Sequence, residues 1–177
     1  RDGSGWKIST TKGDMSAGVV VNAAGAWCDV VGAMAELTPI QLQPKRRTAF
    51  TFGAPEGLDH QAWPMIVEVD HDFYFRPEGP NLLASPGDQT PVEPQDIRHD
   101  EIDVAVAIER IQKFTTMEIR HVQSAWAGLR SFVPDNLPVI GFDPDEEGFF
   151  WLAGQGGYGI MTSPAISRMA AALITTG

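Results

Sequence analysis

Hydrophobic and polar positions alternate along three stretches in the middle of the chain, residues 41–52, 63–77 and 81–88. Each stretch is bounded by Gly, Pro or Asn, and a period of two between such turn residues is typical of β-strands. The sequence therefore predicts an antiparallel sheet in the middle of the chain.

The alternation also assigns side chains to the two faces of this sheet. In 41–52 the alternation places Arg47 on the face opposite to Phe50, and it places Arg46 on the same face as Phe50, the apolar face. In 63–77, Glu68, Asp70, Asp72, Tyr74 and Arg76 share the polar face, and the apolar face carries Trp63, Met65, Val67, Val69, Phe73 and Phe75. We expect one packed face and one polar face from which both Arg47 and Tyr74 project.

Helical patterns lie on either side of the sheet. A helix is predicted at 101–115, because acidic residues occupy its positive end and an apolar stripe follows at Val104, Ile108 and Ile111. In the last helix Ser163 is the expected N-cap and Pro164 the first helical residue. Its predicted buried stripe is Ile166, Met169, Ala170, Leu173 and Ile174.

These elements indicate an α+β fold with three segments, 1–40, 41–125 and 126–177. Short strands at 5–11 and 18–22 and a helical piece at 28–37 precede Pro39, after which the long alternating strands begin. The chain returns from the sheet at 126–131. Because the N-terminus begins as if in the middle of a domain, we expect the chain to be a fragment.

The loop Gly154–Gly159 fits the G-x-G-x-x-G spacing of a dinucleotide-binding turn. That fingerprint requires a second strand after the helix, with an acidic residue about 20 positions on for the ribose. The chain ends at Gly177. Either the match is accidental, or the glycines bring the backbone close to another part of a cofactor.

Composition excludes several classes of function. A net charge of −10 disfavours nucleic acid, which requires clustered Lys and Arg. The most apolar window, 17–37, is interrupted by polar residues and predicts no membrane helix. The single cysteine, Cys28, excludes an intramolecular disulfide, leaves no metal-ligand cluster and fits a reducing cytoplasm.

Three side chains remain as candidates for chemistry. Arg130 lies in the apolar segment WAGLRSFVP, where it either reaches the surface in a structural ion pair or binds a small carboxylate through two parallel hydrogen bonds. Arg47 belongs to a basic cluster, which is more often a solvated face. Tyr74 is either a packing residue or a hydrogen-bond donor to a carboxylate.

Several motifs together resemble the C-terminal half of FAD-dependent amino-acid oxidoreductases of the D-amino-acid oxidase and glycine oxidase group, with the greatest similarity to the D-arginine dehydrogenase branch. They are VVVNAAGAWCD, PKRRTAFTF, FYFRPEGPNLLASPGD, WAGLRSFVPD and FFWLAGQGGYGIMTSP. The resemblance implies that 1–40 and 126–177 are parts of a Rossmann-like FAD domain and that 41–125 is the substrate-binding domain. The true nucleotide fingerprint would lie in an N-terminal half that this chain lacks.

The same resemblance assigns roles to individual residues. Arg130, Arg47 and Tyr74 would bind the substrate carboxylate, with Gly157 at substrate distance. Residues of two loops would contact FAD, with the second loop beside the pyrimidine edge of the flavin: Ala23, Ala24, Gly25, Trp27, Gly156, Gly157, Tyr158, Gly159 and Ile160.

The reaction implied is hydride transfer from the α-carbon of a D-amino acid to FAD, which yields an imino acid and then a 2-oxo acid. A quinone or oxygen would be the electron acceptor, and a cytoplasmic or membrane-peripheral location is expected. Because the nucleotide-binding half is absent, we expect the fragment alone to be inactive. Two alternatives remain: a glycine or sarcosine type of amine oxidase, and a non-catalytic domain that binds a protein partner.

Overall fold

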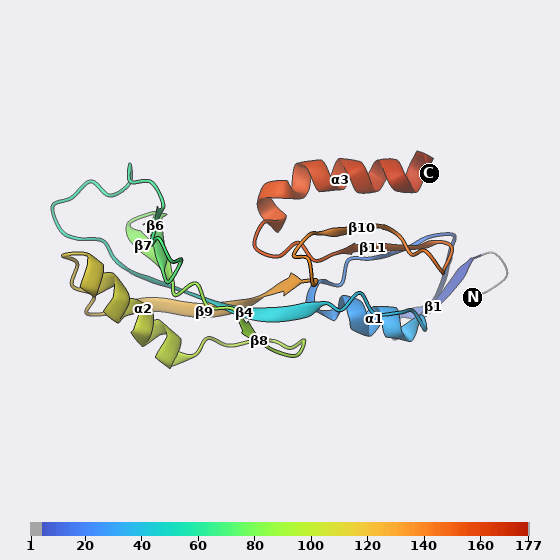
Figure 1. The fold of residues 1–177 in the computed structure, drawn as a ribbon, viewed down its shortest axis with the longest axis horizontal. Coiled ribbons are helices and arrows are strands. Elements are labelled where there is room, and N and C mark those ends of the chain that lie inside the picture. The colour runs from blue at the N-terminus through green and yellow to red at the C-terminus, as the bar shows by residue number, and fades with distance from the viewer. Residues whose placement is uncertain (1–4, 177) are drawn as a thin grey trace. The chain divides into compact units, whose positions relative to one another are not determined.

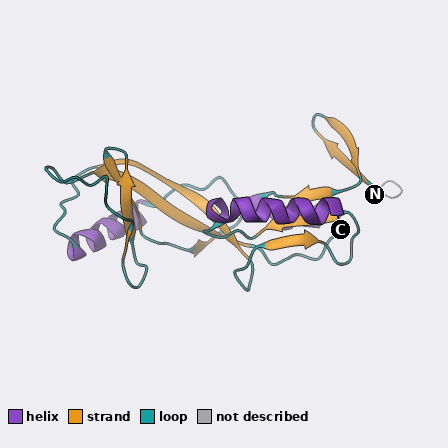
Figure 2. Ribbon diagram, turned by 90° about the horizontal axis from the view of Figure 1, so that it is seen from above, coloured by secondary structure: helices purple, strands orange, loops and turns teal. Residues whose placement is uncertain are grey.

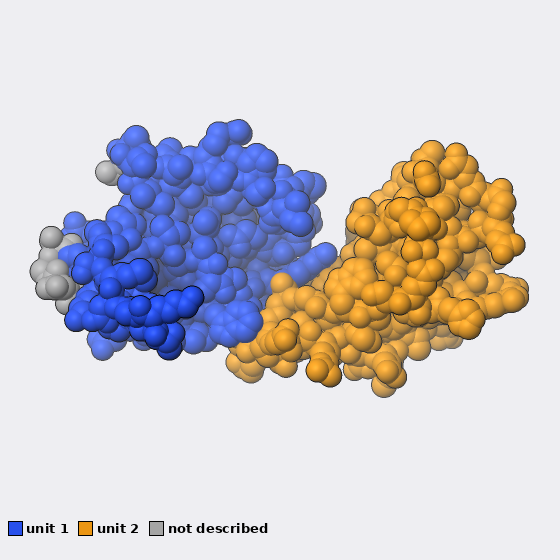
Figure 3. Space-filling view, turned by 180° about the vertical axis from the view of Figure 1, so that it is seen from behind, with its two compact units in different colours: residues 1–44, 130–177 blue, residues 45–129 orange. Residues whose placement is uncertain are grey.

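The computed structural model describes residues 5–176. The chain divides into two compact units, one of residues 1–44 and 130–177 and one of residues 45–129 (Figure 3). We call them the glycine-loop unit and the sheet unit. Two long strands, β4 (Gln43–Gly53) and β9 (Val122–Phe132), contribute residues to both units.

The glycine-loop unit is built around a three-stranded sheet in the order β10 (Val139–Phe142), β11 (Phe149–Ala153) and β3 (Val20–Asn22). β10 and β11 are antiparallel, whereas β11 and β3 are parallel. A hairpin of β1 (Trp6–Thr10) and β2 (Gly13–Ala17) precedes β3.

Helices lie on both faces of this sheet (Figures 1 and 2). A short 3-10 turn, η1 (Gly25–Trp27), leads into α1 (Cys28–Met34), whose Cys28 packs with Phe149 and Trp151 in a buried cluster. Gly32 allows the close approach of α1, because a Cβ there would come 2.5 Å from the Trp151 ring. α3 (Gly159–Thr176) lies along the opposite face. Two covered faces are what parallel strands require.

The sheet unit has the strand order β5 (Ile66–Val67), β6 (Tyr74–Glu78), β7 (Asn81–Ser85), β4 and β8 (Thr90–Pro91), with β9 also paired to β4. α2 (Glu101–Phe114) buries Val104, Ala107 and Ile111 against the strands. The core facing them consists of Phe50, Phe52, Phe73, Phe75, Leu82 and Ala84. The predicted strands 41–52 and 81–88 and the predicted helix 101–115 are confirmed.

The predicted single strand 63–77 is wrong, because a turn divides it into β5 and β6. The Glu68 N–H donates to the Phe73 carbonyl at 3.0 Å, and the Asp70 N–H donates to the Glu68 carboxylate at 2.7 Å. His71 has φ +60°. These side-chain and backbone bonds close a hairpin, so Val69 is 84% exposed instead of buried.

The last helix also differs from the prediction. α3 begins at Gly159, so Ser163 is not its N-cap and Pro164 lies inside it. A proline has no N–H for the carbonyl of residue i−4, which is Ile160, and the Ser163 hydroxyl donates to that carbonyl at 2.9 Å. The predicted stripe is buried only at Ala170, and Met169 and Leu173 are exposed.

Candidate functional site

Two loops leave the sheet of the glycine-loop unit at the same edge. β3 and β11 are parallel, with Val21 opposite Phe150 and Asn22 opposite Trp151. The loop 23–27 follows β3, and the loop 154–158 follows β11. In open α/β sheets ligands bind at the carboxyl ends of parallel strands. The fold thus brings together both segments that the sequence assigned to a cofactor.

The glycine loop packs on the end of β9. The Gly156 N–H donates to the Ser131 carbonyl at 2.9 Å, and a Cβ on residue 156 would come 2.8 Å from the Phe132 ring. Gly154 and Gly156 have φ +69° and +54°, a backbone conformation that favours glycine. Both glycines are therefore required by backbone conformation and close packing, whatever the loop binds.

The N-terminus of α3 presents backbone donors beside this loop. The Thr162 N–H donates to the Tyr158 carbonyl at 2.9 Å, so the amides of Gly159, Ile160 and Met161 precede that bond. Such amides have no partner within a helix, and the helix dipole adds partial positive charge there. Ile160 is 95% exposed. This helix end is suited to an electron-rich acceptor.

Arg130 lies against the glycine loop. A Cβ on residue 157 would come 2.9 Å from Nη1 of Arg130, so the guanidinium packs on the Gly157 backbone. The Arg130 side chain is partly buried, and among residues 5–176 it makes no hydrogen bond or ion pair. A partly buried guanidinium without a carboxylate partner is suited to bind an anion.

The loop after β3 is held by Asn22, which the sequence analysis did not single out. Asn22 is 2% exposed, and its Nδ2 donates to the Cys28 carbonyl at 2.9 Å. Gly25 follows with φ +60°, and Trp27 is 43% exposed. Asn22 therefore fixes the loop whose backbone and indole are accessible. The sequence signal was a polar residue at the end of a buried strand.

Cys28 is fully buried beneath this loop. Burial raises the pKa of its thiol, because a thiolate would lose its hydration there. The protein therefore keeps this cysteine protonated and inert, as a packing residue.

The sheet unit carries Arg47 and Tyr74 on one face, as predicted. Tyr74 is opposite Ser85 and Phe75 is opposite Ala84, while Ala84 is in turn opposite Phe50 of β4. Side chains alternate along each strand, so Tyr74 and Arg47 fall on the face opposite to the buried Phe50 and Phe75. That these two residues and Arg130 bind one carboxylate stays a prediction.

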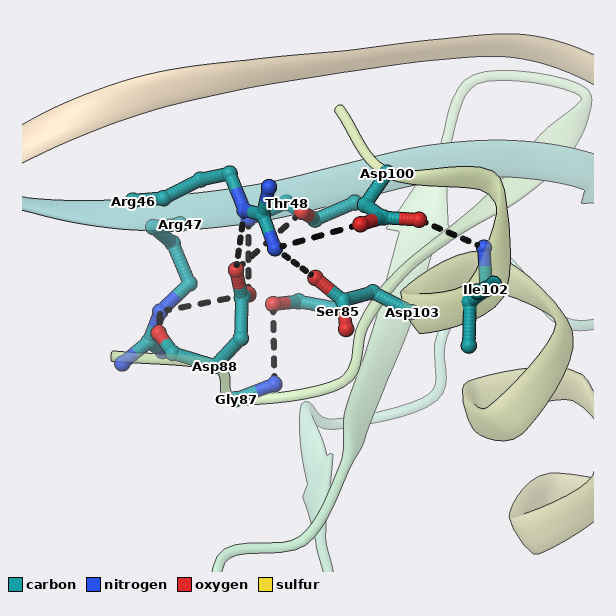
Figure 4. Close-up of polar contacts among 9 residues, drawn as sticks. All are labelled: Arg46, Arg47, Thr48, Ser85, Gly87, Asp88, Asp100, Ile102 and Asp103. Atoms are coloured by element: carbon teal, nitrogen blue, oxygen red, sulfur yellow. Dashed lines mark hydrogen bonds and ion pairs between the residues drawn. The ribbon is translucent and has the colours of Figure 1, made fainter. Parts of the chain in front are cut away.

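Arg46 lies on the apolar side, as the alternation predicts. Its Nη2 contacts Asp103 of α2 at 2.7 Å and Asp100, the N-cap of α2, at 3.7 Å (Figure 4). Asp100 also accepts a hydrogen bond from the Ile102 N–H at 2.9 Å. The arginine that enters the apolar side is thus paired with the acidic first turn of the covering helix.

The residues of the two loops fit a flavin. Exposed amides at the start of α3 provide donors for electron-rich ring atoms, and Trp27 and Ile160 provide apolar surface at the same sheet edge. No group of three or more His, Cys, Asp or Glu within residues 5–176 is placed to hold a metal ion.

The parallel strand pair has loops at its carboxyl ends and helices on both faces of its sheet, an arrangement that binds ligands at that end in open α/β folds. A family model described as "FAD dependent oxidoreductase" (DAO) matches residues 1–173. The chain belongs to this family, whose cofactor is FAD.

Individual relatives agree with this assignment. "FAD-dependent oxidoreductase domain-containing protein 1" of Xenopus laevis is 29% identical over 177 residues, covering 90% of this chain and 35% of that protein. The crystal structure of glycine oxidase from Geobacillus kaustophilus has 27% identity and a TM-score of 0.81, covering 98% of this chain and 45% of that one. The crystal structure of L-proline dehydrogenase from P. horikoshii has 25% identity and a TM-score of 0.82, covering 97% of this chain and 46% of that one. The chain spans less than half the length of these relatives.

In the part of the chain that the structure describes, no helix has the length and apolar character needed to cross a bilayer.

Proposed function

We propose that the chain is the C-terminal part of a flavoprotein that oxidises a small amino acid at its α-carbon. Bound FAD would accept the two electrons of this oxidation. The observation that carries the proposal is the Arg130 guanidinium, which packs on Gly157 beside the cofactor loops and has no carboxylate partner within residues 5–176.

Arg130 would bind the substrate carboxylate through two charge-assisted hydrogen bonds. A carboxylate fixed in this way orients the α-hydrogen and the amino group, and orientation supplies much of the catalysis in such a reaction. The substrate loses a hydride from its α-carbon and a proton from its nitrogen. The resulting imino acid reacts with water to give a 2-oxo acid and ammonia.

The amides at the start of α3 have a second role in this proposal. They would stabilise negative charge on the pyrimidine edge of the cofactor through their hydrogen bonds and the helix dipole. In this proposal the glycine-rich loop has the spacing of a nucleotide fingerprint but would contact the flavin ring and not a pyrophosphate. Ala23, Ala24, Gly25 and Trp27 would contact the same cofactor from the loop after β3.

The sheet unit would be the substrate-binding domain. Arg47 and Tyr74 share its polar face, and we propose that both contact the carboxylate that Arg130 binds. The guanidinium of Arg47 would supply a second positive charge, and the phenol of Tyr74 a neutral donor.

Two substrate groups fit this chemistry. The motif resemblance favours D-amino acids, and the similarity to glycine oxidase favours glycine or an N-methylated relative such as sarcosine. Both groups have a carboxylate and an α-amine, so the same arginine serves either.

Anaerobic reduction of the flavin in the full-length protein tests the proposal. D- and L-alanine, D- and L-arginine, glycine and sarcosine are mixed separately with the protein, and bleaching of the flavin band is followed. Reduction by D-isomers alone supports D-amino-acid oxidation, and reduction by glycine and sarcosine supports the second group. A flavin that no amino acid or amine reduces would contradict the proposal and favour a non-catalytic role. Reoxidation by oxygen compared with a quinone identifies the electron acceptor.

A further inference from the structure

Asp88 lies where the chain passes from one partner of β4 to the next. β7 pairs with β4 at Phe50–Gly53, and β8 pairs with β4 at Lys45 and Arg46. Residues 86–89 join these two strands. The carboxylate of Asp88 is 9% exposed and lies beside the stretch of β4 between the two pairings (Figure 4).

The Asp88 carboxylate is anchored on Thr48. It accepts a hydrogen bond from the Thr48 N–H at 2.7 Å and another from the Thr48 hydroxyl at 3.1 Å. Thr48 is fully buried, so these bonds satisfy polar groups that have no access to water. The contact therefore fixes the connection 86–89 on β4.

Arg46 forms a long ion pair with this carboxylate. Its Nε lies 3.7 Å from Oδ2 of Asp88, and its side chain is 16% exposed. The shortest contact of Arg46 is to Asp103, at 2.7 Å. Arg46 is thus surrounded by carboxylates and has a structural role.

Arg47 meets Asp88 in a different way. Its Nε donates to the main-chain carbonyl of Asp88 at 2.7 Å, whereas the carboxylate Oδ1 is 4.0 Å away. Of these two Asp88 oxygens, the nearer one is therefore the neutral main-chain carbonyl, and its bond to Nε fixes one side of the Arg47 guanidinium.

We propose that Asp88 is a positioning residue for Arg47. Its carboxylate holds the connection 86–89 on Thr48 and beside Arg46, and its carbonyl thereby orients the Arg47 guanidinium for the substrate carboxylate. This inference rests on the proposed function. An arginine ordered before binding loses less side-chain entropy when the substrate arrives, so the benefit appears as substrate affinity.

The test measures flavin reduction in the full-length protein by stopped flow as a function of substrate concentration. This separates the dissociation constant Kd from the limiting rate. In Asp88→Ala, Kd should rise about tenfold, the value of one charged hydrogen bond, with the limiting rate nearly unchanged. Asp88→Asn retains an acceptor for the Thr48 N–H and should restore most of the affinity.

Asp103→Asn is the matched control. It removes a carboxylate that contacts the same Arg46, at 2.7 Å, but does not lie on the connection 86–89, and Kd should not change. An equal rise of Kd in D103N and D88A would show that D88A merely loosens the packing of α2, and would overturn the inference.

Thr48→Val is the variant to use if D88A does not fold. It removes one of the two hydrogen bonds that anchor the Asp88 carboxylate, and Kd should rise about threefold. An unchanged Kd in T48V would also overturn the inference.

Arg47→Met separates this inference from the proposed function. If R47M leaves Kd unchanged, the role proposed for Arg47 fails. If R47M raises Kd but D88A and T48V do not, only the inference fails. In the R47M background, D88A should cause no further rise in Kd. An additive rise in the double variant would contradict the positioning role of Asp88. Carboxylic acids without an amino group should bind more weakly to D88A, whereas amines without a carboxylate should not.

Discussion

The guanidinium of Arg130 lies against the backbone of Gly157, so closely that a Cβ on residue 157 would come 2.9 Å from Nη1. The end of β9 and the loop after β11 therefore form one local structure. The proposed carboxylate-binding guanidinium therefore adjoins the loop proposed to contact the cofactor.

We predict that Gly157→Ala impairs catalysis without loss of FAD. The methyl group must displace the end of the Arg130 side chain, which is flexible, and the backbone at 157 does not require glycine by its φ. The rate of flavin reduction should fall about tenfold, the effect of a small displacement of a positioning group. The flavin content of the purified protein should match the wild type.

Gly156→Ala is the companion variant, and its effect should be on stability. Its Cβ would meet the Phe132 ring at 2.8 Å, and its φ is +54°. The free energy of unfolding should fall by about 1–3 kcal/mol, as measured by denaturant titration.

The opposite result for Gly157→Ala would contradict the proposed role of the loop. If G157A lost FAD and its remaining holoprotein were reduced at the normal rate, the loop would anchor the nucleotide.

Cys28 should resist thiol reagents in the folded protein. Its thiol is fully buried and burial raises its pKa, so little thiolate forms at neutral pH. Labelling should follow the fraction of unfolded protein in a denaturant series. Rapid labelling under native conditions would contradict the packing of α1 on Phe149 and Trp151.

The raised pKa also predicts how stability depends on pH. Above the ordinary thiol pKa the unfolded chain loses this proton while the folded chain keeps it, so the unfolded state binds fewer protons. The free energy of unfolding should therefore decrease as the pH rises through the ordinary thiol pKa. The decrease should be smaller in Cys28→Ala, and equal slopes in both proteins would contradict the expectation.

The purified 177-residue chain should bind no stoichiometric FAD and show no turnover. Gly154–Gly159 is the one G-x-G-x-x-G spacing in the sequence, and in the proposed role this loop contacts the flavin ring and not the phosphates. A yellow, stoichiometric complex after addition of FAD and gel filtration would overturn this prediction.

Much of the sheet unit follows from local pattern. The alternation in β4 places Arg46 and Phe50 correctly, and Asp100 caps α2 as the acidic cluster indicates. The segment 63–77 fails because its alternation continues through a turn, whose bonds to Glu68 cannot be read from a period of two. Similarly, Ser163-Pro164 imitates a helix start, while the serine in fact satisfies a carbonyl inside α3.

The candidate site was predictable only in part. Arg130 and Gly157 were named from sequence, but their contact depends on the end of β9 packing against the loop after β11, and the two residues are 27 positions apart. Asn22 and Asp88 were missed. Asn22 donates to the Cys28 carbonyl across the loop that follows β3, and Asp88 bonds Thr48 and Arg47 of β4, about 40 positions earlier. Neither contact can be read from the period of a strand or helix.

The central claim is that Arg130 binds the substrate carboxylate, and one measurement tests it most directly. The full-length protein is compared with Arg130→Met by steady-state kinetics, with Arg120→Met as a control, because Arg120 is 78% exposed and pairs only with Glu118 among residues 5–176.

R130M should lose about 3–5 kcal/mol of transition-state stabilisation in kcat/KM, because it removes one partner of a desolvated charge pair. R120M should behave as the wild type, and the flavin content of both variants should be normal. A loss of kcat/KM in R130M below about tenfold, the equivalent of 1.4 kcal/mol, would show that Arg130 is structural and contradict the account.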